Sequence, residues 1–410
     1  MATPSPQGKI AVIGGSIAGC AAAIAAYKAG YEVTLYERST GDLAERGFGI
    51  CLPNTLLETC IEAGYLDESL PVWDIYDRHW FTLDKQGEHR HLWTSPSRMA
   101  AFNWGLLWKS LRSRVPDDVY RLGSSVSEVR PTDDGAVVVV DGAEHHYDLV
   151  VGSDGYKSIV RGLVVGDTTP NYSGYVTWRG VVDADALVDC DEALEQLTSS
   201  AATAGFDGGH VMYYPIPGPD GQRRINWLMY TTPPESVDIG LSMSYASADL
   251  EAQLTPFFNR IVEETISPSW ARIVQQTPDT IKAFQPIFDL ELDRCAAAPF
   301  VLTGDASTIT RPHTASGGTK ALEDALCLEE VLRESDDVRD AVAVYNERRN
   351  DNGNRLVQLG RRLGENQVLS TPDWENMDAA KLSDWVAATV AGHNVYIYAQ
   401  ESVKADASGG

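Results

Sequence analysis

The chain has 410 residues, 43% of them hydrophobic, which is long enough for two domains, or a domain and a subdomain, around a packed core. Its 33 basic and 58 acidic side chains give a net charge of −25, which argues against nucleic-acid binding and against docking on an anionic membrane. The six cysteines form no C-x-x-C pair, which argues against dithiol redox chemistry and predicts buried thiols in a reducing, cytoplasmic compartment.

The first structural signal lies near the N-terminus. A short apolar run, Ile10–Ile13, predicts a strand that enters a glycine-rich turn, and the alanine-rich stretch 17–29 predicts a helix. A second apolar run, 33–36, predicts another strand, which ends in Glu37. Glycines and a serine interrupt the uncharged run 10–27, so we interpret it as strand and helix and not as a membrane span or signal peptide.

The turn after the first strand resembles the dinucleotide-binding pattern G-x-G-x-x-G. It comprises Gly14, Gly15, Ser16, Ile17, Ala18 and Gly19. Backbone N–H groups at a helix N-terminus can bind a pyrophosphate, and Glu37, 23 residues after Gly14, can accept hydrogen bonds from a ribose diol. Ser16 replaces the second glycine with another small residue. The pattern predicts a bound dinucleotide but does not separate NAD, NADP and FAD.

The middle of the chain predicts an antiparallel sheet. Residues 71–93 alternate aromatic and polar side chains around a hairpin turn at 85–88, which predicts two antiparallel strands. Residues 172–182 and 209–231 share this character. We therefore expect one sheet, built from separated segments, beside the nucleotide-binding unit.

Two further motifs follow apolar strands. Residues 148–155 end in Asp154-Gly155, which alone predicts only a turn and a capped helix. Residues 300–306 place Gly304-Asp305 at a strand end, and the loop 311–320 then opens a helix. The carboxylate can accept hydrogen bonds from a polyol, and the helix start can present N–H groups to an electron-rich ring edge.

Together, these three motifs resemble those of the group A FAD-dependent aromatic hydroxylases, which are single-component flavoprotein monooxygenases. The resemblance extends over residues 9–350 and includes the Gly47–Ile50 segment, and the loop 311–320 is most similar to the 2,6-dihydroxypyridine hydroxylase branch. Two positions depart from the pattern, because Thr319 replaces a frequent asparagine and Trp104 a frequent arginine.

The resemblance implies an α/β fold, in which a Rossmann-like FAD-binding domain carries an inserted antiparallel-sheet substrate domain, as in para-hydroxybenzoate hydroxylase. The FAD-binding domain would be discontinuous and would comprise residues 1–70, 96–170 and 280–370. The substrate domain would comprise 71–95 and 171–279, followed by C-terminal helices and a loose tail over 371–410.

The resemblance also implies roles in cofactor binding. Glu37 would hold the adenosine ribose, and Asp305 the ribityl hydroxyls. Arg46 would lie near the pyrophosphate or the ribityl chain, Val126 near the adenine, and Asp154 would support the cofactor. The full set implied to bind FAD is Gly14, Gly15, Ser16, Ile17, Ala18, Gly19, Glu37, Arg38, Arg46, Val126, Asp154, Gly304, Asp305, Pro312, Gly317, Gly318 and Thr319.

The implied reaction is hydroxylation of an electron-rich aromatic or N-heterocyclic small molecule, through a flavin C4a-hydroperoxide, with O2 and NADH or NADPH. The protein would act as a monomer or homodimer. Alternatives on the same scaffold are a flavin-dependent epoxidase, reductase or halogenase, and a non-catalytic FAD-binding redox protein. The W-x-W-x-I-P motif of flavin halogenases is missing.

The substrate pocket should be largely apolar with few polar anchors. Candidates on the sheet segments are Trp178, Arg179, His210, Met212, Tyr213, Tyr214, Asn226 and Trp227, of which strand alternation allows only about half to face one side. Candidate bases or substrate anchors are His313, His210 and Tyr214. We expect Glu323 and Asp324 to be surface or capping groups of a helix, and no cluster has metal-ligand spacing.

Overall fold

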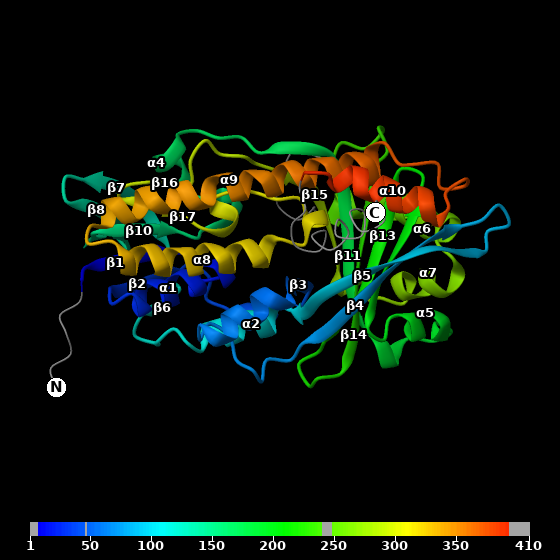
Figure 1. The fold of residues 1–410 in the computed structure, drawn as a ribbon, viewed down its shortest axis with the longest axis horizontal. Helices are drawn as coiled ribbons and strands as arrows, with labels where there is room; N and C mark the ends of the chain where they lie inside the picture. Colours follow the sequence, from blue (N-terminus) through cyan, green and yellow to red (C-terminus); the bar gives the residue numbers. More distant parts are fainter. Residues whose placement is uncertain (1–6, 46, 240–247, 393–410) are drawn as a thin grey trace, which may run out of the picture.

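The computed structural model describes residues 7–45, 47–239 and 248–392. Two units lie side by side along the long axis of the molecule, a mixed α/β unit and a unit built on long antiparallel strands (Figure 1). The fold is therefore α/β, with a Rossmann-like unit next to a large sheet, as the sequence predicts.

A six-stranded sheet forms the centre of the α/β unit. In spatial order its strands are β16 (Ala296–Ala297), β17 (Phe300–Leu302), β10 (Leu149–Gly152), β1 (Lys9–Ile13), β2 (Glu32–Glu37) and β6 (Tyr120–Leu122). All neighbours are parallel except β16 and β17. Both faces are covered, which explains why the strands are continuous apolar runs. The two faces of β1 belong to different hydrophobic clusters, Ile10 and Val12 packing with helix α1 and Ala11 and Ile13 with a small sheet.

That small sheet comprises β7 (Val126–Thr132), β8 (Gly135–Val140) and β9 (Ala143–Tyr147). The eight-stranded sheet of the second unit runs in the order β15 (Lys282–Asp289), β11 (Asn171–Asp183), β14 (Arg223–Thr231), β13 (Gly209–Pro217), β12 (Ser200–Phe206), β4 (Trp73–Leu83), β5 (His89–Asn103) and β3 (Gly49–Pro53). The predicted hairpin over 71–93 is confirmed, because β4 and β5 pair antiparallel.

The eight-stranded sheet is larger than the sequence predicts. Strands β3 and β15 lie at its two edges, in segments that we expected to be part of the FAD-binding domain alone, and β5 continues to Asn103. Each edge strand contains a proline, Pro53 in β3 and Pro286 in β15. Proline weakens a strand prediction because it cannot donate to a ladder, and an edge is where it is tolerated.

Ten helices are described. They are α1 (Ile17–Lys28), α2 (Asn54–Glu62), α3 (Trp104–Arg112), α4 (Arg161–Val165), α5 (Asp191–Gln196), α6 (Ala248–Thr265), α7 (Pro268–Gln275), α8 (Gly317–Glu334), α9 (Val338–Gly364) and α10 (Ala379–Val390). Helices α5, α6 and α7 cover one face of the large sheet through Trp178, Trp227 and Trp270. None of the helices in the described ranges is long and apolar enough to cross a membrane.

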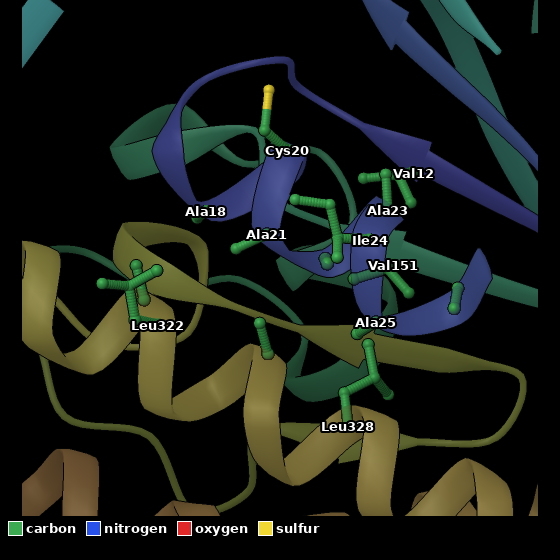
Figure 2. Packing of buried hydrophobic residues seen from close by; sticks show 14 of the residues in the cluster. Val12, Ala18, Cys20, Ala21, Ala23, Ile24, Ala25, Val151, Leu322 and Leu328 are labelled. Atoms are coloured by element: carbon green, nitrogen blue, oxygen red, sulfur yellow. The ribbon is translucent and has the colours of Figure 1, made fainter. Parts of the chain in front are cut away.

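Helices α1 and α8 pack closely although 300 residues separate them in the sequence. Figure 2 shows Leu322 and Leu328 of α8 beside the alanine face of α1, where Ala21 and Ala25 lie. The small alanine side chains permit this close approach. All six cysteines lie in the described ranges and are free thiols. Four of them are buried, as the sequence predicts, whereas Cys51 and Cys327 are half-buried.

Candidate cofactor and substrate site

A cavity of about 1110 Å³ lies between the two units, and both units line it. The α/β unit contributes the glycine-rich turn, Glu37 and the Gly304-Asp305 turn. The large sheet contributes side chains from β4, β5, β11, β13 and β14. A single cavity therefore joins the three predicted motifs to one face of the sheet.

The glycine-rich turn forms the first wall of this cavity. Gly14 has φ +99°, a conformation that disfavours other residues, and a Cβ on Gly19 would overlap the carbonyl oxygen of Gly14. Ser16 precedes α1, whose first turn carries no acidic residue and whose N-terminal residues Ile17 and Ala18 line the cavity. The positive end of the helix dipole is therefore available to a phosphate group.

Glu37 lies at the end of β2, where its carboxylate supports the same turn. Its Oε2 accepts a hydrogen bond from the Gly15 N–H at 2.7 Å, and its Oε1 accepts one from the Ser39 N–H at 2.7 Å. Each oxygen keeps a further lone pair for a diol. Arg38 and Val126 line the same part of the cavity, and Arg46 lies outside the described residues.

The start of α8 forms a second wall. Pro312, Gly317 and Gly318 line the cavity, and the first turn of α8 carries no acidic residue. Ala315, at φ +51°, turns the chain into this helix. Thr319 is buried just beneath the wall, and its Oγ1 has no hydrogen-bond partner among the described residues.

Asp305 lines the cavity, and Arg161 stabilises the turn that carries it. Arg161 donates to the carbonyl oxygens of Asp305 and Ala306 at 3.2 and 3.1 Å. Desolvation raises the pKa of Asp305, and the charges of Lys320 and Arg161 oppose this shift. The carboxylate is accessible from the cavity, where it can accept hydrogen bonds from a polyol.

Asp324 is buried and also stabilises the Gly304-Asp305 turn. The prediction that Asp324 is a surface or capping group of a helix was therefore wrong. Its Oδ2 accepts from the Gly304 N–H at 2.9 Å and lies 3.3 Å from Lys320 Nζ. Its Oδ1 accepts from Arg349 Nε at 2.8 Å. The i,i+4 spacing of Lys320 and Asp324 was visible in the sequence, but the burial depends on α9, which supplies Arg349.

About half of the eight candidate side chains on the sheet line the cavity, as strand alternation predicts. Arg179, His210, Met212 and Tyr214 line the cavity. Trp178, Tyr213 and Trp227 face the opposite side and pack against the helices there. Asn226 accepts a hydrogen bond from the Gly49 N–H at 2.7 Å. Sequence reasoning missed Arg78 on β4 and Ser95 on β5, which also line the cavity.

The two candidate histidines lie next to each other in the cavity wall. Their ring centres are 5.3 Å apart, and the Tyr230 ring lies 4.2 Å from that of His313. His313 Nε2 lies 2.8 Å from the Tyr175 hydroxyl, and His210 Nδ1 lies 3.2 Å from the carbonyl oxygen of Gln367. Because a carbonyl can only accept, this contact assigns the proton of neutral His210 to Nδ1 and leaves Nε2 as an acceptor.

Both imidazoles are neutral at physiological pH. Burial and then the charge of Arg78 lower the pKa of His210 to about 3. Burial, then His210, Arg311 and Arg78, lower the pKa of His313 well below its usual range. Desolvation raises the pKa of Tyr214 well above its usual range, so its hydroxyl is a hydrogen-bond donor and not a base.

We expect the stability of the protein to decrease as the pH falls from about 6.5 towards 3. The unfolded chain binds a proton at His210 below about pH 6.5, whereas the folded protein keeps it neutral. The check is the urea midpoint at about pH 7.5 and about pH 5.5. His210→Gln should reduce the difference, and His146→Gln, at an exposed histidine, should not. Equal pH dependence in all three proteins would contradict the assignment.

The residues present fit FAD. Two helix N-termini without acidic residues and the glycine turn suit a pyrophosphate and an electron-rich ring edge, and Asp305 suits a ribityl chain. Asp154 also lines the cavity. Its Oδ2 accepts from the Ile159 N–H at 2.8 Å, and its Oδ1 has no partner among the described residues.

Comparisons with known proteins agree with this reading. Family models described as "FAD binding domain-like" and "Glucose inhibited division protein A" match residues 172–283 and 9–56. The chain is 28% identical over 381 residues to 2,6-dihydroxypyridine 3-monooxygenase of Paenarthrobacter nicotinovorans, covering 87% of this chain and 91% of the relative. It is 25% identical to 6-hydroxynicotinate 3-monooxygenase of Bordetella bronchiseptica, covering 90% and 95%.

Solved structures show the same fold. 2,6-Dihydroxypyridine-3-hydroxylase from Arthrobacter nicotinovorans superposes with a TM-score of 0.78 at 24% identity, covering 91% of this chain and 96% of that one. Klebsiella pneumoniae HpxO complexed with FAD and uric acid gives 0.73 at 23% identity, covering 93% and 92%. In sequence and fold the chain therefore resembles the group A FAD-dependent aromatic hydroxylases, and FAD is its cofactor.

Proposed function

We propose that this protein uses NADH or NADPH and O2 to hydroxylate an electron-rich heteroaromatic ring that already carries a hydroxyl group. The observation that carries the proposal is the single cavity in which Asp305 and both helix N-termini lie opposite a face of the large sheet. The named relatives act on hydroxylated pyridines, which supports this substrate class.

In this proposal the α/β unit binds the cofactor at one end of the cavity, and the large sheet binds the substrate at the other end. FAD, when bound, supplies the redox and oxygen chemistry. The α/β unit holds it through the glycine-rich turn, Glu37, Asp154 and Asp305. The sheet holds the substrate between Met212 and Tyr230 and keeps water away from the reacting carbon.

Three polar side chains are proposed to position the substrate. Tyr214 donates a hydrogen bond, and His210 Nε2 accepts one from a ring hydroxyl or ring N–H. His313, fixed by Tyr175, packs against the Tyr230 ring in a tilted arrangement and forms the wall beside Pro312. A hydroxyl that donates to His210 makes the ring more electron-rich at the carbon to be oxidised.

The test is turnover by the purified protein. The flavin spectrum reports FAD, and NADH and NADPH oxidation and O2 uptake are followed with hydroxylated pyridines, phenols and purines. We expect one class of hydroxylated heteroaromatic to stimulate both rates and to gain one oxygen atom. FAD without stimulated oxidation would favour a non-catalytic redox protein. Stimulated NAD(P)H oxidation whose product is an epoxide, a halide or a reduced ring would favour the corresponding alternative.

Tyr214→Phe is expected to lower kcat/KM about fivefold, the usual result of removing one neutral hydrogen bond to substrate. FAD content should not change. Tyr213→Phe is the matched control, because Tyr213 lies on the opposite face of β13, where its hydroxyl donates to the Trp270 carbonyl oxygen at 3.3 Å. Equal effects of the two substitutions on kcat/KM would contradict the role of Tyr214.

A further inference from the structure

The carbonyl oxygen of Gly15, in the glycine-rich turn, accepts three side-chain hydrogen bonds. Trp108 Nε1 donates to it at 2.8 Å, the Tyr120 hydroxyl at 3.0 Å and the Cys20 thiol at 3.4 Å. These donors come from three separate elements, α3, β6 and α1. Because a carbonyl oxygen has two lone pairs, the hydrogen-bonding capacity of this oxygen is fully used, and the donors determine its direction.

The three donors belong to the core behind the turn. Trp108, Tyr120 and Cys20 are 7%, 6% and 0% exposed and lie in one hydrophobic cluster. Figure 2 shows Cys20 on the side of α1 that faces away from Leu322 and Leu328. Burial raises the pKa of the Cys20 thiol to about 12 and that of the Tyr120 hydroxyl above its usual range, so both groups keep the protons that they donate.

The same peptide unit carries the N–H group of Ser16. In a trans peptide the C=O and the following N–H point in opposite directions, and the bond between Gly15 and Ser16 is trans. The Ser16 N–H therefore points away from the core donors, and Ser16 lines the cavity. The two preceding N–H groups are already used, because Gly14 donates to the Tyr36 carbonyl oxygen at 2.8 Å and Gly15 to Glu37 Oε2 at 2.7 Å.

Tyr120 also explains why the residue before Ser16 is a glycine. A Cβ on Gly15 would lie 2.2 Å from the Tyr120 hydroxyl oxygen. Glycine leaves the backbone free to rotate, so the direction of this peptide depends on the hydrogen bonds to its carbonyl oxygen. Tyr120 is itself fixed, because it pairs with Leu35 in the sheet and the Arg112 guanidinium lies over its ring at 4.2 Å. Donors to the carbonyl also polarise the peptide and strengthen its N–H as a donor.

We propose that Trp108 and Tyr120 are positioning residues for the pyrophosphate of FAD, because they orient the Gly15–Ser16 peptide so that the Ser16 N–H is available to a phosphate group. The two side chains act through the backbone and not by contact with the cofactor. An N–H group that is oriented before binding spares FAD the free energy of ordering the turn. The inference concerns the cofactor alone and does not depend on the substrate or the reaction of the proposed function.

The test measures FAD affinity in two variants that each remove one donor and keep an aromatic ring, Tyr120→Phe and Trp108→Phe. The FAD-loaded, full-length protein is diluted, and the fluorescence of the released flavin gives the dissociation constant. We expect each substitution to weaken FAD binding about three- to tenfold, and the double variant about 10- to 100-fold.

A spectroscopic measurement separates positioning from a general loss of stability. At saturating FAD, the phosphorus-31 NMR signals of the bound pyrophosphate should shift in both variants, because the hydrogen bond from the Ser16 N–H changes. The visible absorption spectrum of the bound flavin should not change, since the start of α8 forms a separate wall for the ring. A substitution that only destabilises the fold would leave the phosphorus signals of the bound cofactor in place.

The large sheet offers matched controls. Trp374→Phe removes an indole N–H that donates to the Phe206 carbonyl oxygen at 3.1 Å, and Tyr213→Phe removes a hydroxyl that donates to the Trp270 carbonyl oxygen at 3.3 Å. Both side chains are buried, so the urea midpoint should fall by a similar amount in controls and test variants. FAD affinity and the phosphorus signals should be unchanged in the controls.

Three results would overturn the proposal. They are FAD affinity in Tyr120→Phe and Trp108→Phe equal to that of the unmodified protein, phosphorus signals that do not move, and an equal loss of affinity in the controls. If Trp108→Phe does not fold, Tyr120→Phe is sufficient, because it removes a single oxygen atom. Since FAD affinity is measured without substrate, the result is independent of whether a hydroxylated product is found.

Discussion

Asp324→Ala is expected to lower the free energy of unfolding by about 3–5 kcal/mol, the usual cost of removing one partner from a buried ion pair. The substitution leaves the Lys320 ammonium and the Arg349 guanidinium in the interior without the carboxylate between them. It also removes the acceptor of the Gly304 N–H. Chemical unfolding of the FAD-saturated protein measures the loss.

Glu330→Ala is the matched control for Asp324→Ala. Glu330 pairs with Arg348 at 3.1 Å across the same two helices, but both side chains are exposed, so the expected change is within about 0.5 kcal/mol. The charges of Lys320 and Arg349 overcome the effect of burial and lower the pKa of Asp324 below 3.8. Its contribution is therefore present above pH 3.8 and is lost as the pH falls through the lowered value. Equal losses in the two variants at neutral pH would contradict this account.

Asp305→Ala is expected to weaken FAD binding about 100-fold, because two hydrogen bonds from a polyol to a carboxylate are lost. The fold should remain, since the side chain faces the cavity and the turn is held through backbone groups by Arg161 and Asp324. The measurement is the FAD-to-protein ratio after gel filtration, together with FAD titration.

Two further variants serve as an intermediate case and a control for the Asp305 experiment. Asp305→Asn keeps the shape and one acceptor oxygen, so it should bind FAD with intermediate affinity. Asp293→Ala, at an exposed aspartate before β17, should bind like the unmodified protein. Full FAD occupancy of Asp305→Ala at nanomolar protein concentration would show that Asp305 does not hold the cofactor.

The nucleotide-binding turn could be predicted from the sequence because its determinants are local. Gly14 and Gly19 are required by backbone contacts within a few residues, and the apolar runs on either side specify the strands. FAD in place of NAD followed only from the joint presence of Asp154-Gly155 and Gly304-Asp305 with that turn. Each of these motifs alone is a common strand end.

The cavity-facing side chains of the sheet were harder to predict. Simple alternation separates Ile75 from Arg78, yet both line the cavity because a bulge lies between Ile75 and Asp77. Nothing local in the sequence marks that bulge. Asp324 was missed for a related reason, since its burial depends on Arg349, which belongs to another helix.

The order of the six-stranded sheet has a consequence for biosynthesis. Strand β1 pairs with β10, and β10 pairs with β17, so the central strands are translated some 150 residues apart. A nascent chain that ends before Phe300 exposes one edge of β10, which is an apolar strand. The wall formed by Asp305 and α8 follows β17 directly. The complete cofactor-binding wall therefore cannot form until about three-quarters of the chain has been made, and shorter chains expose an unpaired apolar strand edge, which favours aggregation.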